Sequence, residues 1–373
     1  MTSNILLLGA TGYTGGLVLD SLLRRGVRPT LAGRNPAALA ALAERSGGLD
    51  HVVVDAADPA SLRRHLSPGD VLITTVGPFE RHGYPVAEAA ADIGAHYIDS
   101  TGEVGFVRNL QERYHRRAQE TGAVMLPAFG YDYVPGILAG ALATHQAGGS
   151  VRALDIGYFA TAPLRKGISQ GTRTTMRDGL TLPSTRLHRN RLREERTASR
   201  VVDFPVLGGR RSAFLVSGTE VLFLPTAFPE LSGITVYNGW FPELSRVLSV
   251  VSGAVNAVNR LPGGSGLTDL MTRPMASGPP GGPDAAERAR NRSLVVAVAS
   301  NGVLGSDPLA EVQLEGPNPY SLTGELMAWA AQHLADGSEE TRPDTAPGVV
   351  GPLEAFGLDT LHDACAEIGL APR

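Results

Sequence analysis

The chain has 373 residues, of which 43% are hydrophobic and 19% are charged, so it can build two domains with sizeable cores. Its net charge of -4 gives no reason to expect a nucleic acid partner. The single cysteine, Cys365, excludes an internal disulfide bond, and no apolar run is long enough to span a membrane. We expect a cytoplasmic protein that has no signal peptide and acts on a small molecule. A homodimer is possible, and membrane association is an alternative that we do not favour.

The first apolar run, Ile5–Leu8, is followed by glycines at positions 9, 12 and 15, and a helical pattern begins at Leu17. In such an opening one glycine allows a tight turn, one lets the backbone approach a pyrophosphate, and one lets the helix pack close to the sheet. The N-terminus of the helix then binds the phosphates. The opening therefore predicts a dinucleotide site. A sugar-nucleotide site and a fold that no longer binds a nucleotide are the alternatives.

Apolar runs and helical patterns alternate through the first third of the chain. The predicted strands are Ile5–Leu8, Pro29–Ala32, His51–Asp55, Val71–Thr75, Tyr97–Asp99 and Val124–Leu126. The predicted helices are Leu17–Arg25, Pro36–Ser46, Pro59–Leu66, Pro85–Gly94 and Val107–Thr121. This βαβ alternation predicts an α/β fold with a doubly wound parallel sheet of the Rossmann type.

The pattern changes after Pro127, where apolar runs follow one another with little helix between them. The predicted strands are Val151–Thr161, Ala213–Val216, Val221–Leu224, Ile234–Tyr237, Leu294–Ala299 and Ala310–Leu314. Asn301–Gly302 is typical of a hairpin turn between the last two. We expect a second α+β domain with a largely antiparallel sheet.

Helical spacing returns in three later segments. Leu244–Leu261 has apolar residues at 244, 247, 248, 251, 255 and 258, which predicts a helix packed on the second sheet; a lipid- or partner-facing helix is the alternative. Met275–Asp284 is rich in proline and glycine and predicts a loop. Ser321–Ala335 and Leu358–Ile368 are helical and are expected to return to the first domain. The predicted domains are residues 1–128, 129–320 and 321–373.

A basic run, Arg186–Arg196, has no aromatic residues among its charges. It predicts a solvated helix or loop. The alternative is a mobile lid that attracts an anionic substrate.

Arg34 follows the second predicted strand, and no acidic residue occurs between Asp20 and Glu44. An NAD enzyme places an acid near this point to bind the ribose 2′-hydroxyl, whereas an arginine suits a 2′-phosphate. We therefore predict NADP(H) rather than NAD(H), with Asp55 as an adenine contact.

Ligands of open α/β sheets bind at the carboxyl ends of the strands. Val76, Gly77 and Pro78 follow the fourth strand, so we expect them beside the nicotinamide ribose, with Phe79 next to the substrate. Tyr97–Glu103 and Pro127–Gly136 reach the same edge of the sheet. The second of these segments joins the two predicted domains.

Hydride addition to a conjugated C=C bond or to a C=N bond benefits from a nearby proton donor. Tyr131 is our first candidate, with Tyr133 and Tyr84 behind it. Asp132 is a further candidate, although it also suits a role in capping the next helix or orienting the loop.

Several reaction classes are excluded by missing residues. The Tyr-x-x-x-Lys pair of short-chain dehydrogenases is absent, because the chain's one lysine, Lys166, has Ala162 four positions before it. Cys365 is too close to the end of the chain to serve as the nucleophile of semialdehyde reductases. No Cys/His spacing suggests a metal site, so no metal is expected.

Together the segments GATGYTG, LAGRN, TTVGPFERHGYPVAEAAADIGAHYIDSTGE and PAFGYDYVPG resemble the saccharopine dehydrogenase-like reductases. The closest branch is that of the trans-acting enoyl reductases and saccharopine dehydrogenase-like oxidoreductases. The resemblance covers nearly the whole chain. It implies an NADP-preferring Rossmann domain, a second α/β domain and C-terminal helices that pack on the first domain.

The resemblance also assigns site residues. Its glycine-rich turn falls on Gly9, Thr11, Gly12, Tyr13, Thr14 and Gly15, its 2′-phosphate arginine on Arg34, and its Val-Gly-Pro turn on Val76, Gly77 and Pro78. Gly171 and Thr172 match a segment of the second domain and are expected, with Arg173, to contact the substrate. The family's Gly-Phe-Asp-Ser-x-Pro appears here with Tyr131 and Tyr133 as departures. The predicted function is an NADPH-dependent reductase acting on a C=C or C=N bond. The alternatives are a dinucleotide sensor without catalysis and a lipid-associated scaffold.

Overall fold

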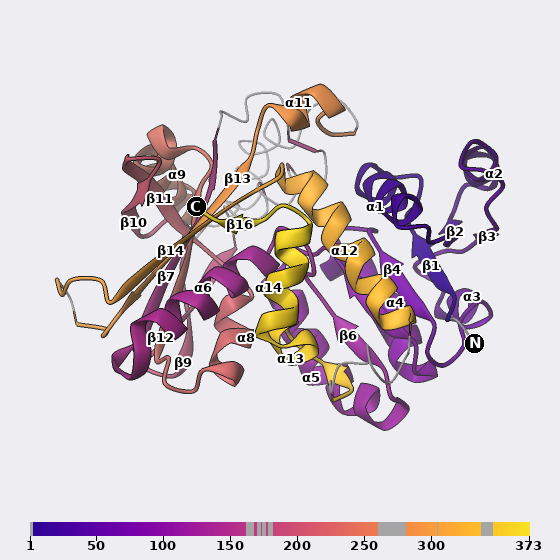
Figure 1. Cartoon of the computed structure of the whole chain (residues 1–373), viewed down its shortest axis with the longest axis horizontal. Helices are drawn as coiled ribbons and strands as arrows, with labels where there is room; N and C mark the ends of the chain where they lie inside the picture. The colour runs from indigo at the N-terminus through magenta and orange to yellow at the C-terminus, as the bar shows by residue number, and fades with distance from the viewer. Residues whose placement is uncertain are drawn as a thin grey trace. The chain divides into compact units, whose positions relative to one another are not determined.

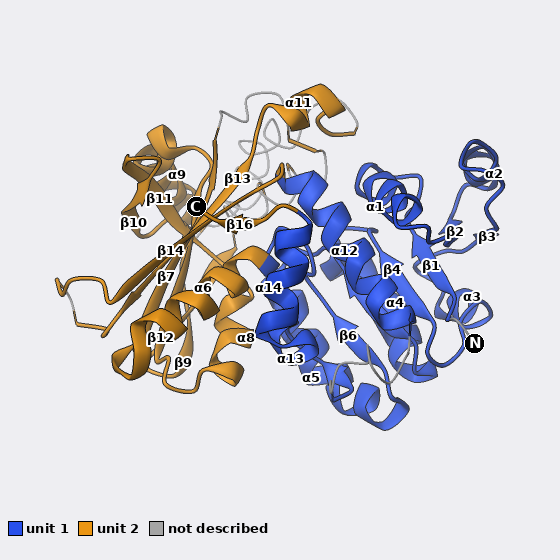
Figure 2. Ribbon diagram, viewed as in Figure 1, with its two compact units in different colours: residues 1–134, 319–368 blue, residues 135–318, 369–373 orange. Residues whose placement is uncertain are grey.

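The computed structural model describes residues 3–161, 168–169, 173, 177, 182–259, 281–303, 305–336 and 346–373. The chain forms two compact units, drawn in blue and orange in Figure 2. Unit 1 comprises residues 1–134 and 319–368, and unit 2 comprises residues 135–318 and 369–373.

Unit 1 contains a parallel sheet with helices between its strands (Figure 1). Its strands are β1 (Ile5–Leu8), β2 (Thr30–Gly33), β3 (His51–Val53), β4 (Val71–Thr74), β5 (His96–Asp99), β6 (Val124–Leu126) and β15 (Gly348–Val349). Its helices are α1 (Tyr13–Arg24), α2 (Pro36–Arg45), α3 (Pro59–Arg63), α4 (Phe79–Ile93), α5 (Val104–Thr121), α12 (Pro319–Ala335), α13 (Pro352–Phe356) and α14 (Leu358–Glu367).

The strand order of this sheet is β15-β6-β5-β4-β1-β2-β3, and all its pairings are parallel. The central strands β1 and β4 are buried along their whole length, as expected for continuous apolar runs with helices on both faces. The predicted Rossmann fold is confirmed. All six predicted strands are present, and β15 is a short seventh strand that the sequence analysis did not predict.

Several helices of unit 1 begin earlier than predicted, and the difference is largest for α1 and α4. The first, α1, begins at Tyr13 rather than Leu17, directly after the glycine turn. The helix α4 begins at Phe79 rather than Pro85, and it accommodates Pro85 in its interior. Pro85 has no N–H to donate to the carbonyl oxygen of Arg81, so α4 lacks one helical hydrogen bond at this turn. Both differences move a helix N-terminus towards the carboxyl edge of the sheet.

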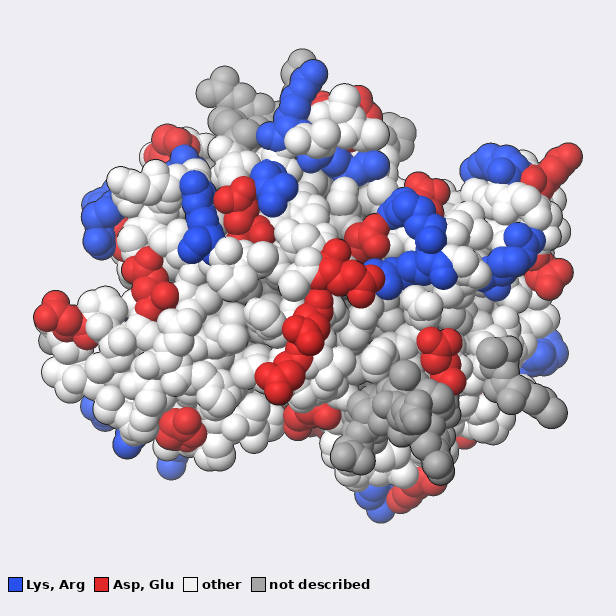
Figure 3. Space-filling model, viewed as in Figure 1, with Lys and Arg blue, Asp and Glu red and all other residues white. Residues whose placement is uncertain are grey.

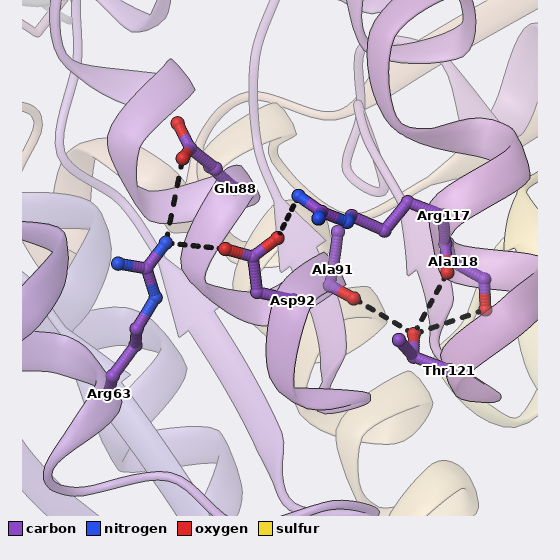
Figure 4. A network of polar contacts seen from close by, with 7 residues as sticks. All are labelled: Arg63, Glu88, Ala91, Asp92, Arg117, Ala118 and Thr121. Carbon is purple, nitrogen blue, oxygen red and sulfur yellow. Dashed lines mark hydrogen bonds and ion pairs between the residues drawn. The ribbon is translucent and has the colours of Figure 1, made fainter.

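Three charged side chains connect α3, α4 and α5 (Figure 4). Asp92 near the end of α4 pairs with Arg63 through one carboxylate oxygen and with Arg117 through the other. The Thr121 hydroxyl donates to the carbonyl oxygen of Ala91 at 2.8 Å. Helices in a βαβ unit run opposite to the strands, so the ends of α4 and α5 lie at the amino edge of the sheet. This network therefore connects the helices at the amino edge of the sheet, which is opposite to the predicted site.

Unit 2 contains a mixed sheet of nine strands. They are β7 (Ala153–Ala160), β8 (Pro183–His188), β9 (Arg191–Arg196), β10 (Val201–Val206), β11 (Gly209–Val216), β12 (Gly233–Gly239), β13 (Ser293–Ser300), β14 (Ala310–Gly316) and β16 (Ala371–Pro372). Its helical segments are α6 (Val134–Ala147), α8 (Glu220–Ala227), α9 (Ser245–Asn259) and α11 (Ala285–Ala289), with short 3-10 turns at Gly148–Ser150 and Pro242–Leu244.

The pairing of β7 with β12 is parallel, and the other pairings of this sheet are antiparallel. This confirms the expected largely antiparallel sheet. Its core includes an aromatic cluster in which Phe204 packs edge-to-face against Phe159 and Tyr237. The predicted hairpin is also present, since β13 pairs with β14 across the segment that begins at Asn301 and Gly302.

Two predictions for unit 2 were wrong. Val221–Leu224 is helical and belongs to α8, because a short run of buried apolar residues does not distinguish a strand from a buried helix. The basic run Arg186–Arg196 forms the hairpin of β8 and β9 rather than a helix or loop. Arg189 and Asn190 both have positive φ values, of 52° and 58°, which suit a two-residue hairpin turn. Its role as a lid stays a prediction.

The helix predicted for Leu244–Leu261 is present as α9, but its apolar stripe is mostly not turned towards the sheet. Val247, Val250 and Val251 are exposed, whereas Ser245 and Ser252 are buried. The Ser252 hydroxyl donates to the carbonyl oxygen of Thr197 at 2.6 Å, so hydrogen bonds as well as apolar contacts hold this face of the helix.

Charged side chains of both signs are mixed over the face drawn in Figure 3, with acidic side chains gathered over α14. In the part of the chain that the structure describes, no helix has the length and hydropathy needed to cross a bilayer. The segment Met275–Asp284, predicted to be a loop, lies mostly outside the described residues.

Candidate functional site: the carboxyl edge of the parallel sheet

The strand order of unit 1 reverses direction beside β1, which lies between β2 and β4. In doubly wound sheets the crevice for a ligand lies at the carboxyl ends of the strands at this reversal. The segments after β1 and β4 are in direct contact there. The Thr75 N–H donates to the carbonyl oxygen of Leu8 at 3.0 Å, and the Thr75 hydroxyl lies 3.3 Å from the carbonyl oxygen of Gly9.

The glycine turn between β1 and α1 leaves no room for side chains at two positions. Gly9 has a φ of +89°, and a Cβ atom there would lie 2.6 Å from the Thr75 hydroxyl oxygen. A Cβ atom on Gly15 would lie 2.2 Å from the carbonyl oxygen of Gly9. The turn is closed by the Gly12 N–H, which donates to the Gly9 carbonyl oxygen at 2.9 Å. The sequence therefore needs glycine here for the close packing of α1 against the turn.

The N-termini of helices α1 to α4 differ in how they are capped. The side chains of Asn35 and Asp58 cap α2 and α3 by accepting N–H groups of the first turn. The carboxylate of Glu103 does the same for α4, accepting the N–H groups of Phe79 and Glu80 at 2.9 Å each. The N-cap of α1 is Gly12, which has no side chain to offer. Because the N-cap residue of α1 is glycine, no N-cap side chain occupies the space at this helix start, which suits an anion.

The other residues of the predicted phosphate turn lie at this same helix start. Thr11 is exposed, and Tyr13 and Thr14 are the first two residues of α1. The Tyr13 ring packs edge-to-face on that of Tyr320, with 5.4 Å between centroids. The structure thus brings the predicted turn residues together. Their contact with a nucleotide stays a prediction.

Arg34 lies directly after β2 and is exposed. In the described part of the chain its guanidinium has no hydrogen bond or ion pair, so it is available to an anion. Asp55 is also exposed, and its carboxylate accepts the Ala57 N–H at 3.0 Å in a local turn. Both residues lie after neighbouring strands, at the carboxyl edge of the sheet.

The segment Val76–Pro78 follows β4, and the peptide bond between Gly77 and Pro78 is cis. The Val76 N–H donates to the hydroxyl of Thr74 at 3.3 Å. This segment lies against the glycine turn through Thr75, as described above. The Phe79 ring is buried and packs on Phe106, with 5.9 Å between centroids, so its predicted contact with substrate is not apparent in this arrangement.

Asp99 at the end of β5 is fully buried and holds the loop that follows β6. One carboxylate oxygen accepts the N–H groups of Thr101 and Ala128 at 2.8 Å each, and the other accepts the Tyr97 hydroxyl at 2.7 Å. Burial raises the pKa of Asp99 to about 6, although these three hydrogen bonds act in the opposite direction. Asp99 was not among the predicted site residues. The sequence feature that could have identified Asp99 is an acidic residue at the end of an apolar strand.

The segment 127–133, called the β6 loop below, carries three of the predicted catalytic residues. The Tyr131 side chain is buried, and its N–H donates to the hydroxyl of Thr323 at 3.1 Å. The Tyr133 hydroxyl donates to the carbonyl oxygen of Gly102 at 2.9 Å. Asp132 keeps some exposed surface, but desolvation of its carboxyl raises its pKa to about 6. No hydrogen bond offsets that desolvation in the described residues.

Tyr84, the remaining catalytic candidate, lies on α4. Its hydroxyl donates to Glu80 at 2.8 Å and accepts from Asn109 at 2.7 Å, and the Arg113 guanidinium lies 4.4 Å from its ring centroid. Burial raises the pKa of Tyr84 to about 12. The structure therefore places Tyr84 in a polar cluster between α4 and α5, apart from the β6 loop candidates.

Three predicted substrate residues belong to unit 2. Gly171 and Thr172 lie outside the described residues. Arg173 is described, and its guanidinium donates to the carbonyl oxygen of Ile168 at 2.6 Å. A surface hollow of about 450 Å³ lies instead on α4 and α5, lined by charged side chains such as Glu112 and Arg116. Its mixed charge gives it no clear ligand. Over the described residues, no group of three or more His, Cys, Asp or Glu side chains could hold a metal ion.

Comparison with known proteins shows what the domain that contains this edge is similar to. Residues 5–126 match the family model described as saccharopine dehydrogenase NADP binding domain. A putative trans-acting enoyl reductase of Mycobacterium tuberculosis is 28% identical over 408 aligned positions, which cover 99% of this chain and 96% of that protein. A trans-acting enoyl reductase of Mycobacterium ulcerans is 42% identical over 137 residues, which is 35% of this chain and 33% of that protein.

A probable mitochondrial saccharopine dehydrogenase-like oxidoreductase of Arabidopsis thaliana is 35% identical over 147 residues, or 32% of its length. The alignments with this protein and with the M. ulcerans reductase thus span about a third of those relatives. Among solved structures, apo saccharopine dehydrogenase (L-Glu forming) from Saccharomyces cerevisiae has a TM-score of 0.61 and 16% identity, with 100% of this chain and 99% of that chain covered. These findings confirm the predicted fold, the predicted family resemblance and NADP(H) as the cofactor.

Proposed function

We propose that the chain, which is similar to the saccharopine dehydrogenase-like oxidoreductases and has an NADP-binding domain, is an NADPH-dependent reductase of a conjugated, enoyl-type C=C bond. The observation that carries the proposal is the glycine turn at the start of α1, with Gly12 as N-cap, at the reversal point of the sheet, in a chain similar over its whole length to a putative enoyl reductase. Enoyl reduction is the activity in the name of that relative, and we propose the same activity for this chain.

The binding of NADPH is assigned to the residues at the carboxyl edge. The N–H groups of the turn Gly9–Gly15 bind the pyrophosphate, and Arg34 binds the 2′-phosphate through charge-assisted hydrogen bonds. Asp55 lies beside the adenine, and Val76–Pro78 lies beside the nicotinamide ribose. The exposure of Arg34, without a partner in the described residues, supports its part in this arrangement.

Bound NADPH supplies the hydride, and the chain supplies position and a proton. Addition of hydride to the β-carbon of an enoyl group leaves a negative charge on the carbonyl oxygen and the α-carbon. A positioned acid at this point is typically worth about 10²–10⁴-fold in rate. We assign this proton to the β6 loop, with Tyr131 as the donor and Asp132 as the competing candidate. Tyr133 is a further candidate, and its hydroxyl donates to the carbonyl oxygen of Gly102.

The test follows deuterium from NADPH labelled at C4 of the nicotinamide. Two acceptors are offered: crotonyl-pantetheine, which has a conjugated C=C bond, and 1-pyrroline-2-carboxylate, which has a C=N bond. The proposal predicts deuterium at the β-carbon of the thioester. Transfer only to the imine would assign the reaction to C=N reduction. Micromolar binding of NADPH without transfer to either would favour a dinucleotide sensor.

Two variants then test the proton donor. Tyr131→Phe is expected to lower turnover of the accepted substrate by about 10²-fold while the Kd for NADPH is unchanged. Asp132→Asn serves as the matched variant one position along the loop. If Asp132→Asn loses turnover and Tyr131→Phe keeps it, the donor is the carboxyl.

A further inference from the structure

The helix α12 makes close contact with two parts of the predicted site that are far apart in sequence. One is α1, the helix that follows the glycine turn and has Gly12 as its N-cap. The other is the β6 loop, which carries Tyr131 and Asp132. All three elements belong to unit 1, and α12 is drawn in light orange beside α1 in Figure 1.

The contact with α1 is tight along several turns. A Cβ atom on Gly324 would lie 3.0 Å from the carbonyl carbon and oxygen of Leu17, so the helix backbones approach as closely as glycine permits. The Ser21 hydroxyl donates to the Glu325 carboxylate at 2.6 Å, and the same carboxylate pairs with Arg24. With the ring contact between Tyr13 and Tyr320, these interactions fix α12 to the phosphate-binding helix.

The contact with the β6 loop is made by Thr323, one residue before Gly324. Its hydroxyl donates to the carbonyl oxygen of Pro319 at 2.9 Å and accepts the N–H of Tyr131 at 3.1 Å. The first hydrogen bond orients the hydroxyl so that a lone pair faces the loop. A Cβ atom on Gly130 would lie 2.9 Å from the Thr323 methyl carbon, so the loop backbone is in contact with this side chain.

We propose that Thr323 is a positioning residue that fixes the β6 loop relative to the phosphate-binding start of α1. Thr323, Gly324 and Glu325 are consecutive residues of one helix, so the loop contact and the α1 contacts cannot move independently. Other anchors of the loop, such as the hydrogen bond from Ala128 to Asp99, connect it to β5 and not to α1. The inference rests on the proposed function in one respect: it takes the α1 turn and the β6 loop to be parts of one site.

The consequence is a coupling between the cofactor and the proton-donating loop. Binding of a pyrophosphate orders the start of α1, and α12 transmits that order to Tyr131 through the Thr323 hydroxyl. Valine has nearly the shape of threonine but cannot accept the N–H, whereas serine can. The two substitutions therefore separate the hydrogen bond from the packing of the side chain.

The experiment measures backbone hydrogen–deuterium exchange in a peptide spanning 127–134, with and without saturating NADPH, in the full-length protein. In the wild type and in Thr323→Ser, NADPH is expected to slow exchange in this peptide. In Thr323→Val, exchange is expected to be roughly fivefold faster without cofactor and to respond little to NADPH. Thr144→Val is the matched control, since the buried Thr144 hydroxyl donates to the Gly140 carbonyl four residues earlier, with no loop contact assigned to it.

A fluorescence titration of NADPH on the same samples separates the possible failures. If no variant binds NADPH, the proposed function fails, while the faster exchange of Thr323→Val still tests the hydrogen bond. If all of them bind NADPH and the peptide exchanges alike in Thr323→Val and wild type, the positioning role is overturned. Equal effects of Thr323→Val and Thr144→Val would also overturn it, because they would reflect a general loss of stability. Rescue by serine supports it.

Discussion

Glu103 lies in the segment that follows β5. Its carboxylate accepts the N–H of Phe79 at 2.9 Å and so caps the N-terminus of α4. With its second oxygen it accepts the N–H of Glu80. The neighbouring α1 has Gly12 as its N-cap, which carries no side chain. An acidic side chain therefore caps one helix at this edge, whereas the other begins with glycine, and this difference favours the proposed binding of the anionic cofactor at α1.

Replacing Glu103 by glutamine should destabilise the fold, because one amide oxygen replaces two charged acceptors at the start of α4. We expect a loss of about 1 kcal/mol in the free energy of unfolding, as for other helix caps. Urea denaturation measures it. Glu112→Gln is the control, because Glu112 is an exposed residue of the neighbouring helix. Equal stabilities for the two variants would show that the cap contributes little.

Gly15→Ala should abolish NADPH binding at micromolar concentrations, since its Cβ atom would lie 2.2 Å from the Gly9 carbonyl oxygen and force the turn apart. Gly16→Ala is the adjacent control. A Cβ atom there meets nothing within 4 Å, and alanine favours a helix over glycine by about 1 kcal/mol. Nicotinamide fluorescence and thermal unfolding measure the two effects. Unchanged affinity in Gly15→Ala would mean that the turn does not contact the cofactor.

Arg34→Asp should weaken NADPH far more than NADH. Loss of one charge-assisted hydrogen bond costs roughly 1.5–3 kcal/mol, which corresponds to about tenfold or more in Kd. Arg45→Asp makes the same change of charge at an exposed position in the last turn of α2 and should affect both cofactors little. If Arg34→Asp weakens both cofactors equally, Arg34 does not recognise the 2′-phosphate.

Asp132→Asn should stabilise the fold at pH 8 but not at pH 4. The pKa of Asp132 is raised from 3.8 to about 6 in the folded chain, so ionisation costs stability. The cost is absent below pH 4, grows between pH 4 and 6, and is constant above; it amounts to at most about 3 kcal/mol for this partly exposed residue.

Urea unfolding at both pH values measures this difference. Asp363→Asn, at a highly exposed position on α14, is the control and should show no such dependence on pH. If Asp132→Asn raises the free energy of unfolding equally at pH 4 and pH 8, the raised pKa of Asp132 is contradicted. An increase in the free energy of unfolding that appears only at pH 8 would indicate that Asp132 lowers the stability of the fold, as residues of functional sites commonly do.

The parallel sheet could be predicted from the sequence because most of its strands are short, buried apolar runs separated by helical patterns, although β3 is largely exposed. Asn35 and Asp58 are residue types that typically cap helices. The glycines near the start of the sequence form a recognisable nucleotide-binding pattern. The second sheet was harder. The strand β9 is mostly charged, and its hairpin with β8 depends on positive φ values at Arg189 and Asn190, which no apolar periodicity reveals.

The nucleotide turn of the candidate site was predicted because its glycines are local in sequence. Glu103, Asp99 and Thr323 were missed because each acts on a segment far from it along the chain. Thr323 contacts Tyr131 across 192 positions, a separation that only the folded chain brings together. The orientation of α9 was also unpredictable, since Ser245 and Ser252, satisfied by backbone carbonyls, share its inner face with Val255, whereas other valines of the helix are exposed.

The most direct test of the account is a titration of the wild-type protein with NADPH and with NADH, followed by nicotinamide fluorescence. The account predicts micromolar binding of NADPH and a Kd for NADH about tenfold or more higher, since NADH lacks the phosphate assigned to Arg34. Binding of neither cofactor at micromolar concentrations would contradict the reductase function, and equal binding of both would contradict the role of Arg34.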